Sequence, residues 1–286
     1  MKIAAVVILY NPGEEVIHNI QSYLNNVEKV YVLDNTEEPN KKLINKLSLL
    51  AKTVYFNDRE NKGIAVRLNY ASKMAIHDGF EGLLTMDQDS YFNQSDISNI
   101  IACISLHANK SEVAMYGVEY VKEPAEKNTC KHIETEQLIT SGSIVNLSLF
   151  NAVGGFDESL FIDEVDLDYC YNSITKGFKI IKFTNIFLNH SLGKVSYHPS
   201  LKDLQSTPRT LHSPLRVYYM IRNFLYVNAK YKNNFSLDKE RRKKGLLNRV
   251  KNNILYGRNR LLLIRLIFEA FKDYKNNKMG KKFKII

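Results

Sequence analysis

The sequence predicts an α/β fold in which helices cover both faces of a mainly parallel central sheet. Three observations lead to this prediction. Short apolar segments alternate with helical patterns through the first half of the chain, and such alternation is typical of right-handed βαβ units. The segment Ile3–Tyr10 has the continuous apolar character of a strand buried on both faces. Four consecutive predicted strands end in Asn or Asp, at the edge where sheets of this kind bind their ligands.

The first half of the chain supplies regular elements in strict order. Apolar runs predict strands at Ile3–Tyr10, Lys29–Leu33, Thr53–Phe56, Gly82–Met86 and Val113–Val118. Apolar residues at three-to-four spacing predict helices near Glu14–Leu24, Lys41–Leu50, Gly63–His77 and Ser95–His107.

The second half is less regular. Tyr120–Gln137 is polar and predicts a loop, and the segment after it predicts a strand, a short helix and a Gly-Gly turn. Asp166–Thr175 predicts a helix, and Phe178–Phe183 and Ile186–Leu192 predict two further strands. Beyond Pro214 the pattern is that of amphipathic helices.

Composition excludes several classes of protein. The 286 residues are 44% hydrophobic and 24% charged, which is the range of globular proteins and not of disordered ones. No run of about 18 apolar residues predicts a transmembrane helix, and no small-residue cleavage site follows the first strand, so a secretory signal is not expected. The three cysteines are far apart, which indicates a reducing compartment and argues against a disulfide framework or a thiolate zinc site.

The net charge of +10 is concentrated at the end of the chain. From Lys232 onwards 17 Lys and Arg residues face 4 Asp and Glu residues, whereas the preceding part holds 23 basic and 26 acidic residues. We therefore predict a domain at residues 1–230 and a basic helical tail at residues 231–286. Three interpretations of the tail stay open: a helix lying on an anionic membrane surface, a packed helical cap with a solvated basic face, and nucleic-acid binding, for which no recognition motif is present.

The polar strand ends indicate a nucleotide ligand held with the help of a metal ion. The turn after the first strand lacks both the G-x-G-x-x-G pattern and a Walker loop, so a diphosphate would need a divalent cation as its counter-charge. Asp87 and Asp89 follow the fourth strand and point to the same side if the chain stays extended. Carboxylates are common ligands of Mg²⁺ and Mn²⁺. The alternative interpretation is a polar turn, since Asn and Asp favour turns.

A second acidic cluster comprises Asp163, Glu164, Asp166 and Asp168, at the start of a predicted helix. Carboxylates are favoured there by the helix dipole, which accounts for some of them. Four carboxylates so close together also predict that one of them has a raised pKa and can accept a proton.

The ordered set of motifs resembles family 2 glycosyltransferases of the GT-A fold. The motifs are "ILYNP", "VLDNT", "NKGIAVRLN", "LLTMDQDS", "TSGSIVNLSLFNAVGGFDESLFIDEVDLDYC" and "HSPLRVYYMIRN". The "DQDS", "FIDEVD" and "HSPLRVYYMIRN" segments are most similar to the rhamnosyltransferase branch. The resemblance covers roughly residues 1–230 and is more specific for the family than for the donor sugar.

The resemblance implies a role for individual residues. The nucleobase and ribose pocket would be lined by Tyr10, Asn11 and Asp34, flanked by Asn61 and Asn69. Asp87 and Asp89 would hold Mn²⁺ or Mg²⁺ and the diphosphate, with His190 near the diphosphate as a further metal ligand or an aid to the leaving group. Asp166 would be the base that deprotonates the acceptor hydroxyl. The acceptor or leaving-group side would hold His212, Arg216, Tyr218 and Tyr219.

The resemblance also implies a reaction and its partners. The chain would be an inverting transferase that moves L-rhamnose from dTDP-rhamnose to a glycan or lipid-linked acceptor in the synthesis of cell-surface polysaccharide. UDP-glucose, UDP-galactose or UDP-GlcNAc are alternative donors, and a non-catalytic nucleotide-sugar-binding or scaffold protein is the alternative from another class. We expect a cytoplasmic protein, with attachment to the inner membrane surface and a homodimer left open, and no nucleic-acid partner. A nucleotidyltransferase is disfavoured because its Gly-rich basic first loop is missing.

Overall fold

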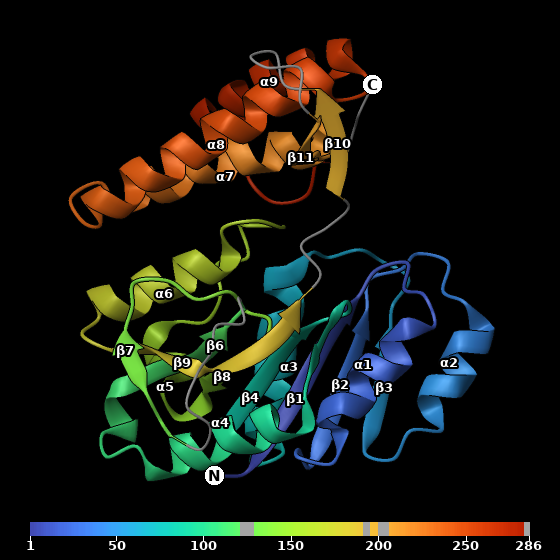
Figure 1. Ribbon diagram of the computed structural model, residues 1–286, viewed down its shortest axis with the longest axis vertical. Helices are drawn as coiled ribbons and strands as arrows, with labels where there is room; N and C mark the ends of the chain where they lie inside the picture. Colours follow the sequence, from blue (N-terminus) through green and yellow to red (C-terminus); the bar gives the residue numbers. More distant parts are fainter. Residues whose placement is uncertain (121–128, 191–194, 200–205, 283–286) are drawn as a thin grey trace. The chain divides into compact units, whose positions relative to one another are not determined.

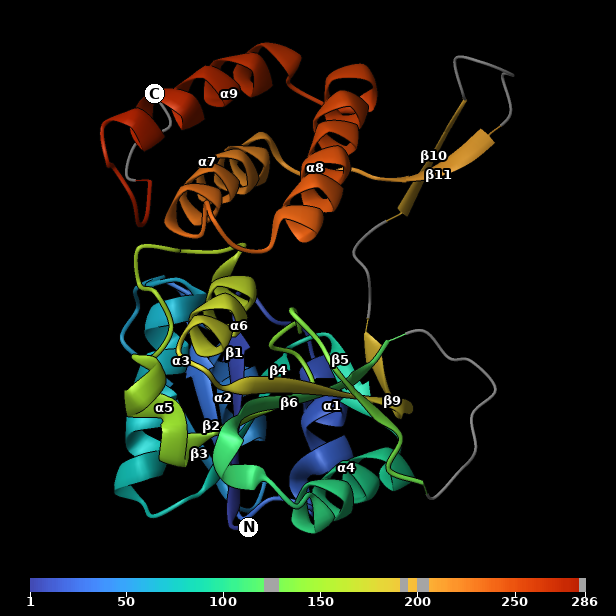
Figure 2. The ribbon, with the colours of Figure 1, turned by 90° about the vertical axis from the view of Figure 1, so that its left-hand side faces the viewer.

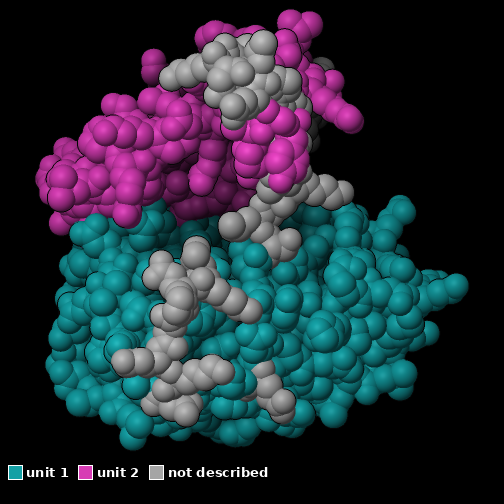
Figure 3. Space-filling model, viewed as in Figure 1, with its two compact units in different colours: residues 1–158, 165–191 teal, residues 159–164, 192–286 magenta. Residues whose placement is uncertain are grey.

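The computed structural model describes residues 1–120, 129–190, 195–199 and 206–282. It divides the chain into two compact units (Figures 1 and 3). The first unit comprises Met1–Glu158 and Val165–Ser191, and the second comprises Ser159–Glu164 and Leu192–Ile286. The second unit thus includes a short loop, residues 159–164, taken from within the sequence of the first.

A mixed sheet forms the centre of the first unit. Its main path has the order β3-β2-β1-β4-β8-β6-β9-β5, and β7 pairs with β9. The strands are β1 (Ile3–Leu9), β2 (Lys29–Asp34), β3 (Thr53–Asn57), β4 (Gly82–Asp87), β5 (Ser90–Phe92), β6 (Val113–Glu119), β7 (His132–Glu134), β8 (Ser143–Asn146) and β9 (Lys179–His190).

Most of the long strands run in one direction. Strands β3, β2, β1 and β4 pair in parallel, and β6 pairs in parallel with β9. Strand β8 is antiparallel to both of its neighbours, β4 and β6, so β6 and β9 run in the same direction as β4. The ends of β1, β2 and β4 therefore meet at one edge, where the sequence predicts a ligand.

Helices cover both faces of this sheet (Figure 2). Helices α1, α2 and α4 contribute to the apolar cluster on one face, and α3, α5 and α6 pack beside one another on the other. The helices are α1 (Glu15–Leu24), α2 (Lys41–Ser48), α3 (Ile64–His77), α4 (Gln94–Leu106), α5 (Leu147–Val153) and α6 (Val165–Thr175).

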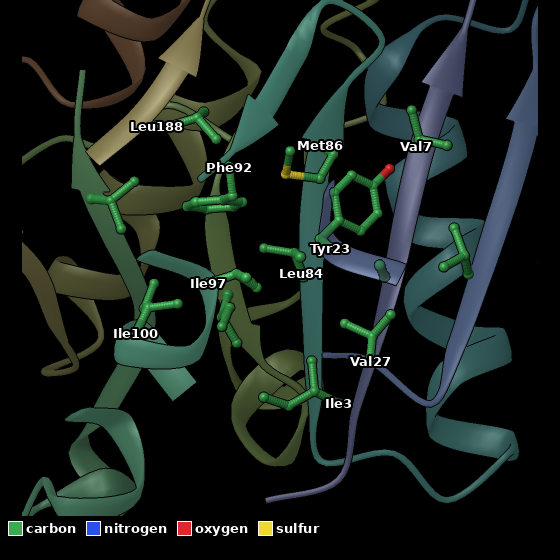
Figure 4. Packing of buried hydrophobic residues seen from close by; sticks show 14 of the residues in the cluster. Ile3, Val7, Tyr23, Val27, Leu84, Met86, Phe92, Ile97, Ile100 and Leu188 are labelled. Atoms are coloured by element: carbon green, nitrogen blue, oxygen red, sulfur yellow. The ribbon is translucent and has the colours of Figure 1, made fainter. Parts of the chain in front are cut away.

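Apolar side chains fill the space between the sheet and helices α1 and α4. Alternate residues of β1, such as Ile3 and Val7, point to the same face as Leu84 of β4 (Figure 4). Tyr23 of α1 covers them and is 1% exposed. Burial of such side chains contributes on the order of 2 kcal/mol each, so the apolar strands hold the polar strand ends in register.

Three helices and a hairpin make up the described part of the second unit beside its loop. The helices are α7 (Pro214–Lys230), α8 (Ser236–Tyr256) and α9 (Arg260–Lys275), and the hairpin consists of β10 (Val195–Pro199) and β11 (Ser206–Thr210). Helix α7 packs on α9 through a core that contains Val217, Tyr218 and Leu266. A boundary near residue 230 stays a prediction.

Two expectations from the sequence are wrong. Phe178–Phe183 and Ile186–Leu192 are not separate strands, because β9 runs without a break from Lys179 to His190. A disulfide joins Cys103 of α4 to Cys130, with the two Cα atoms 5.4 Å apart, although the cysteine spacing argued against disulfides. The third cysteine, Cys170, is free and buried.

Among the helices that the structure describes, none combines the length and the apolar character needed to cross a membrane.

Candidate active site

Three side chains that could hold a metal ion lie together where β4 ends, and we call them the metal cluster. One ligand atom each from Asp87, Asp89 and His190 lies within 4.8 Å of the others. Asp87 is the last residue of β4 and Asp89 lies in the turn to β5. His190 ends β9, which pairs with β5 so that His190 lies opposite Ser90. The Asp-x-Asp motif is thus brought to a histidine about 100 residues further along the chain.

A buried serine orients the imidazole ring of His190. The hydroxyl oxygen of Ser90 lies 2.6 Å from Nδ1 of His190, and Ser90 is 0% exposed. Oδ1 of Asp89 lies 3.8 Å from the same nitrogen. Histidines that bind metals commonly have one ring nitrogen fixed by such a partner. Two carboxylates and one oriented imidazole form a donor set that fits Mn²⁺, and the imidazole disfavours Mg²⁺, which takes oxygen ligands.

The glutamine between the two aspartates ties the metal cluster to the end of β1. The backbone N–H of Tyr10 donates to Oε1 of Gln88 at 2.8 Å, and Nε2 of Gln88 donates to the carbonyl oxygen of Tyr10 at 3.3 Å. Nδ2 of Asn19 donates to the carbonyl oxygen of Gln88 at 2.8 Å. Gln88 therefore fixes the turn that carries Asp89, a role that sequence analysis did not assign.

The predicted nucleobase residues lie at the neighbouring strand ends. Tyr10 is 47% exposed, and Asn11 has a left-handed backbone with φ 47°. The N–H of Asn11 donates to Oγ1 of Thr36 at 2.8 Å. The carboxylate of Asp34 accepts hydrogen bonds from the N–H of Thr36 at 2.8 Å and from the hydroxyl of Tyr55 at 2.7 Å. The structure thus brings Tyr10, Asn11 and Asp34 to one rim through Thr36 and the β1–β2 pairing.

Asn61 and Asn69 occupy different surroundings. Oδ1 of Asn61 accepts from the N–H of Gly63 at 3.1 Å, just before α3. The amide of Asn69 is buried and bonds both backbone groups of Phe156, donating to its carbonyl at 2.9 Å and accepting from its N–H at 2.8 Å. These bonds hold the Gly-Gly turn that leads toward α6. A place for Asn69 beside the nucleotide stays a prediction.

An arginine that sequence analysis missed supports the same rim. Arg67 of α3 is 2% exposed, and its Nε donates to Oδ1 of Asn35 at 2.8 Å. Its guanidinium also pairs with Asp58 and holds the pKa of that carboxyl well below its usual range. Arg67 thereby fixes the side chain of Asn35, the residue after Asp34.

Asp166 lies in the first turn of α6, in the same unit as the metal cluster. Its Oδ1 accepts a hydrogen bond from the N–H of Leu167 at 2.9 Å. Tyr120 lies close enough to Asp166 and to Asp87 of the metal cluster for their charges to act on it. Burial raises the pKa of Tyr120 most, and the negative charges of Asp166 and Asp87 raise it further. Ser141 makes a second link, because its hydroxyl accepts from the N–H of Asp87 at 3.1 Å and its carbonyl accepts from the Tyr120 hydroxyl at 3.4 Å.

The acidic cluster around Asp166 is divided by ion pairs. Arg216 pairs with Asp163 through Nε, 2.7 Å from Oδ2, and Arg242 pairs with Glu164. Burial raises the pKa of Asp163, and the Arg216 guanidinium opposes this shift. The predicted cause, repulsion between crowded carboxylates, does not contribute to it. The remaining two carboxylates, Asp166 and Asp168, belong to α6.

The four residues predicted for the acceptor or leaving-group side all lie in the second unit. Tyr218 and Tyr219 are 1% and 3% exposed, and their hydroxyls bond to Asp273 and to the N–H of Lys282, each at 2.8 Å. His212 is partly buried, and burial followed by nearby arginine charges lowers its pKa below 6.5. Arg216 makes the ion pair described above. Contact of these four residues with an acceptor stays a prediction.

Comparison with known proteins gives relatives for both sequence and fold. No protein-family model matches the chain. The chain is 26% identical over 244 residues to the dTDP-rhamnosyl transferase RfbF of Shigella flexneri, covering 77% of this chain and 78% of that protein. The structure of S. aureus TarS 1–349 in complex with UDP-GlcNAc has a TM-score of 0.56 at 16% identity, over 96% of this chain and 80% of that one.

A second solved structure is GalNAc-T7 with UDP, GalNAc and Mn²⁺. Its TM-score is 0.55 at 12% identity, and the match covers 89% of this chain but spans only 57% of GalNAc-T7. The two structural likenesses confirm the predicted fold class.

Proposed function

We propose that this chain, a protein of the GT-A fold similar to family 2 glycosyltransferases of the rhamnosyltransferase-like branch, transfers L-rhamnose from dTDP-rhamnose to a glycan or lipid-linked acceptor in cell-surface polysaccharide synthesis. The general activity, transfer of a sugar from a nucleotide-sugar donor, is supported by both the sequence relative and the structural neighbours. Rhamnose as the sugar is supported by the name of the 26% identical relative.

The observation that carries this proposal is the grouping of Asp87, Asp89 and His190 at the end of β4. Their donor atoms suit a divalent cation beside the diphosphate of a nucleotide sugar, and a structural neighbour was crystallised with Mn²⁺ and UDP. When bound, Mn²⁺ or Mg²⁺ would neutralise the charge on the departing diphosphate. Asp166 would accept the proton of the acceptor hydroxyl as this oxygen attacks the anomeric carbon. Attack from the face opposite the nucleotide would invert that carbon.

Nucleotide selectivity tests the proposal directly. We expect dTDP to raise the melting temperature of the protein in the presence of Mn²⁺ and to have little effect without it, since the cation supplies the counter-charge. UDP and GDP serve as controls for selectivity between nucleobases. Release of nucleotide from dTDP-rhamnose, UDP-glucose, UDP-galactose and UDP-GlcNAc identifies the donor. Consumption of a UDP-sugar but not of dTDP-rhamnose would overturn the rhamnose assignment, whereas binding without turnover of any donor would favour the non-catalytic alternative.

The second unit offers a surface that fits an anionic membrane. Four apolar side chains on α9 are exposed at spacings of three and four residues, which places them on one helix face; their exposed fractions are 86%, 41%, 71% and 45% for Leu261, Ile264, Phe268 and Phe271. From residue 232 onwards the chain carries 17 basic and 4 acidic residues, an excess of 13 positive charges. Apolar side chains on a basic helix are typical of helices that lie on anionic lipid. We propose that this face attaches the enzyme to the inner membrane surface.

Vesicle sedimentation tests the membrane proposal. The protein should sediment with phosphatidylglycerol-containing vesicles and much less with pure phosphatidylcholine. The double substitution Leu261→Gln and Phe268→Gln should weaken this binding at least ~10-fold, since each side chain loses its burial in lipid. Leu49→Gln, at a residue that is also 86% exposed but lies in the first unit, should bind as the wild type does. Equal sedimentation of the double variant would remove this face from membrane binding, and a concentration-dependent dimer that it abolishes would assign the face to a homodimer.

A cytoplasmic location is what the sequence predicts, and one feature of the structure argues against it. The Cys103–Cys130 disulfide is a feature more typical of oxidising compartments. Fractionation of cells combined with thiol labelling of these two cysteines tests the location, because a labelled pair in the cytoplasmic fraction supports it and an oxidised pair outside that fraction contradicts it.

A further inference from the structure

Two segments of the first unit, distant in the sequence, each carry one cysteine and one histidine. Cys103 of α4 precedes His107, the residue after that helix, by four residues, and Cys130 precedes His132 of β7 by two. The disulfide joins the two cysteines, and the ring centroids of the two histidines lie 5.2 Å apart. Cysteine therefore meets cysteine, and histidine meets histidine.

The two spacings place each cysteine on the same side of its segment as its histidine. Residues four apart lie one above the other on a helix face, and residues two apart point to the same side of an extended chain. The N–H of Thr184 donates to the carbonyl of Lys131 at 3.0 Å, so the residues before β7 continue its pairing with β9. Four side chains that commonly bind metals thus gather in one place, where His132 is exposed.

The imidazole of His107 is neutral and has an unused nitrogen. Its Nδ1 is buried and makes no hydrogen bond with any residue that the structure describes. Burial lowers the pKa of His107 below 6.5, and the positive charges of His132 and two neighbouring lysines lower it further. The neutral ring is the form that binds a metal ion, so His107 needs no loss of a proton to become a ligand at neutral pH.

The imidazole of His132 is oriented by a backbone carbonyl. Nδ1 of His132 lies 2.9 Å from the carbonyl oxygen of Cys130. A carbonyl only accepts hydrogen bonds, so Nδ1 carries the proton and the lone pair of the neutral ring is on Nε2. Histidines that bind metals usually have their other ring nitrogen fixed by such a partner. Nε2 of His132 therefore has the form required of a metal ligand.

We propose that the reduced chain binds a zinc ion through Cys103, His107, Cys130 and His132. Two thiolates and two imidazoles are a common tetrahedral ligand set for Zn²⁺. In the disulfide form the sulfur atoms are bonded to each other, so the site is complete only after reduction. Neither segment contains the pair of cysteines by which zinc sites are usually found in a sequence, which is why the spacing argued against one.

The charges around this Cys2His2 site are compatible with zinc. A divalent ion with two thiolates and two neutral imidazoles has no net charge, so nearby cations do not oppose its binding. One of these cations, Lys179, is moreover ion-paired with Glu112 at 3.2 Å and with Glu134 at 3.5 Å. The site is separate from the metal cluster of Asp87, Asp89 and His190, and the proposal does not depend on transferase activity.

A two-electron exchange separates the two forms. A thiol reductant such as glutathione opens the disulfide and is itself oxidised to a disulfide, while the two cysteines take up two electrons and two protons. Zn²⁺ then displaces the two thiol protons and leaves two thiolates as ligands. In a reducing compartment zinc would therefore join α4 to the segment before β7, the two elements that the disulfide joins under oxidising conditions.

Cobalt absorption tests the site in the full chain. Co²⁺ can take the place of Zn²⁺ in tetrahedral sites, and it shows a charge-transfer band when thiolates bind it. We expect this band when the reduced protein is titrated with Co²⁺ and expect a stoichiometric amount of Zn²⁺ to remove it. Protein with an intact disulfide should show no band. The carboxylates and imidazole of the metal cluster give no thiolate band, so they do not interfere.

Histidine substitutions test the complete ligand set. His107→Gln and His132→Gln should each weaken Zn²⁺ binding to the reduced protein at least ~10-fold, because loss of a ligand costs no less than loss of a residue that supports one. His77→Gln is the matched control, since the side chain of His77 is 90% exposed and lies beside Asp78. It should bind Zn²⁺ as the wild type does, whereas Cys130→Ser should abolish the cobalt band.

Two outcomes would overturn the proposal. One is the absence of a charge-transfer band in the reduced wild type, and the other is unchanged Zn²⁺ affinity in both histidine variants, which would leave the two thiolates alone as ligands. Should the variants fail to fold, alkylation of the reduced wild type decides instead. Zn²⁺ should slow the reaction of iodoacetamide with Cys103 and Cys130, with the free, buried Cys170 as the internal reference. Equal rates with and without Zn²⁺ would contradict the site.

Discussion

Replacing Asp166 with asparagine is expected to lower turnover at least ~10²-fold, the usual contribution of a general base. The amide keeps the shape of the side chain and cannot take a proton from the acceptor hydroxyl. Donor binding should change little, because the metal cluster and the strand-end rim do not include Asp166. Turnover with saturating acceptor, measured beside nucleotide binding by calorimetry, checks both parts of the expectation.

Asp96→Asn is the matched control for Asp166→Asn. Asp96 also lies in the first turn of a helix, α4, and has no place in the proposed reaction. Near-normal turnover in Asp166→Asn would remove this residue from the mechanism, and an equal loss in both variants would indicate a general effect on the fold.

The second large effect is expected at the metal cluster. Asp89→Asn should lower turnover ~10²- to 10³-fold, because charge stabilisation by a bound cation supplies several kcal/mol. It should also abolish the Mn²⁺-dependent part of the thermal shift with nucleotide. Treatment of the wild type with EDTA should have the same effect on turnover, and added Mn²⁺ should restore it better than Mg²⁺ does, given the imidazole of His190.

The control for Asp89→Asn is Glu37→Gln, which removes one exposed negative charge from the segment after β2. Full activity in EDTA, together with normal activity in Asp89→Asn, would exclude the proposed role of the cluster. Loss of activity in Asp89→Asn but not in His190→Gln would restrict the ligand set to the two carboxylates.

Elements with a strong local pattern could be predicted from the sequence. Strands β1 to β4 and helices α1 to α4 lie within a few residues of their predicted bounds, because each combines an apolar run or stripe with clear polar ends. The hairpin β10–β11 and the short strands β5 and β7 were not predicted. Strand β9 was predicted as two because Thr184 and Asn185 interrupt its apolar pattern, but contacts with the segment of Thr129 and Lys131 keep the strand continuous.

Some residues of the candidate site could likewise be predicted from local sequence, and others could not. Asp87 and Asp89 could be found because a single residue separates them in the sequence and they stand at the end of a strand. Tyr120, Ser141 and Arg67 could not, because their importance arises from contacts between elements that are distant in the chain. The Cys103–Cys130 bond is another example, since it depends on α4 lying beside the residues that precede β7. The local sequence pattern thus predicts where the acidic residues of the site lie. The residues that contact and orient them are determined by tertiary structure.

The side chain of Gln88 has a consequence for engineering donor choice. If Tyr10 and Asn11 line the nucleobase pocket as predicted, exchanging Tyr10–Pro12 for the corresponding turn of another transferase is an obvious way to alter nucleobase preference. The two hydrogen bonds between Gln88 and the Tyr10 backbone mean that such a graft also moves the turn bearing Asp89. On the proposed function, donor selectivity and metal affinity would therefore change together, and a successful graft would have to carry both turns, residues 10–12 and 87–90.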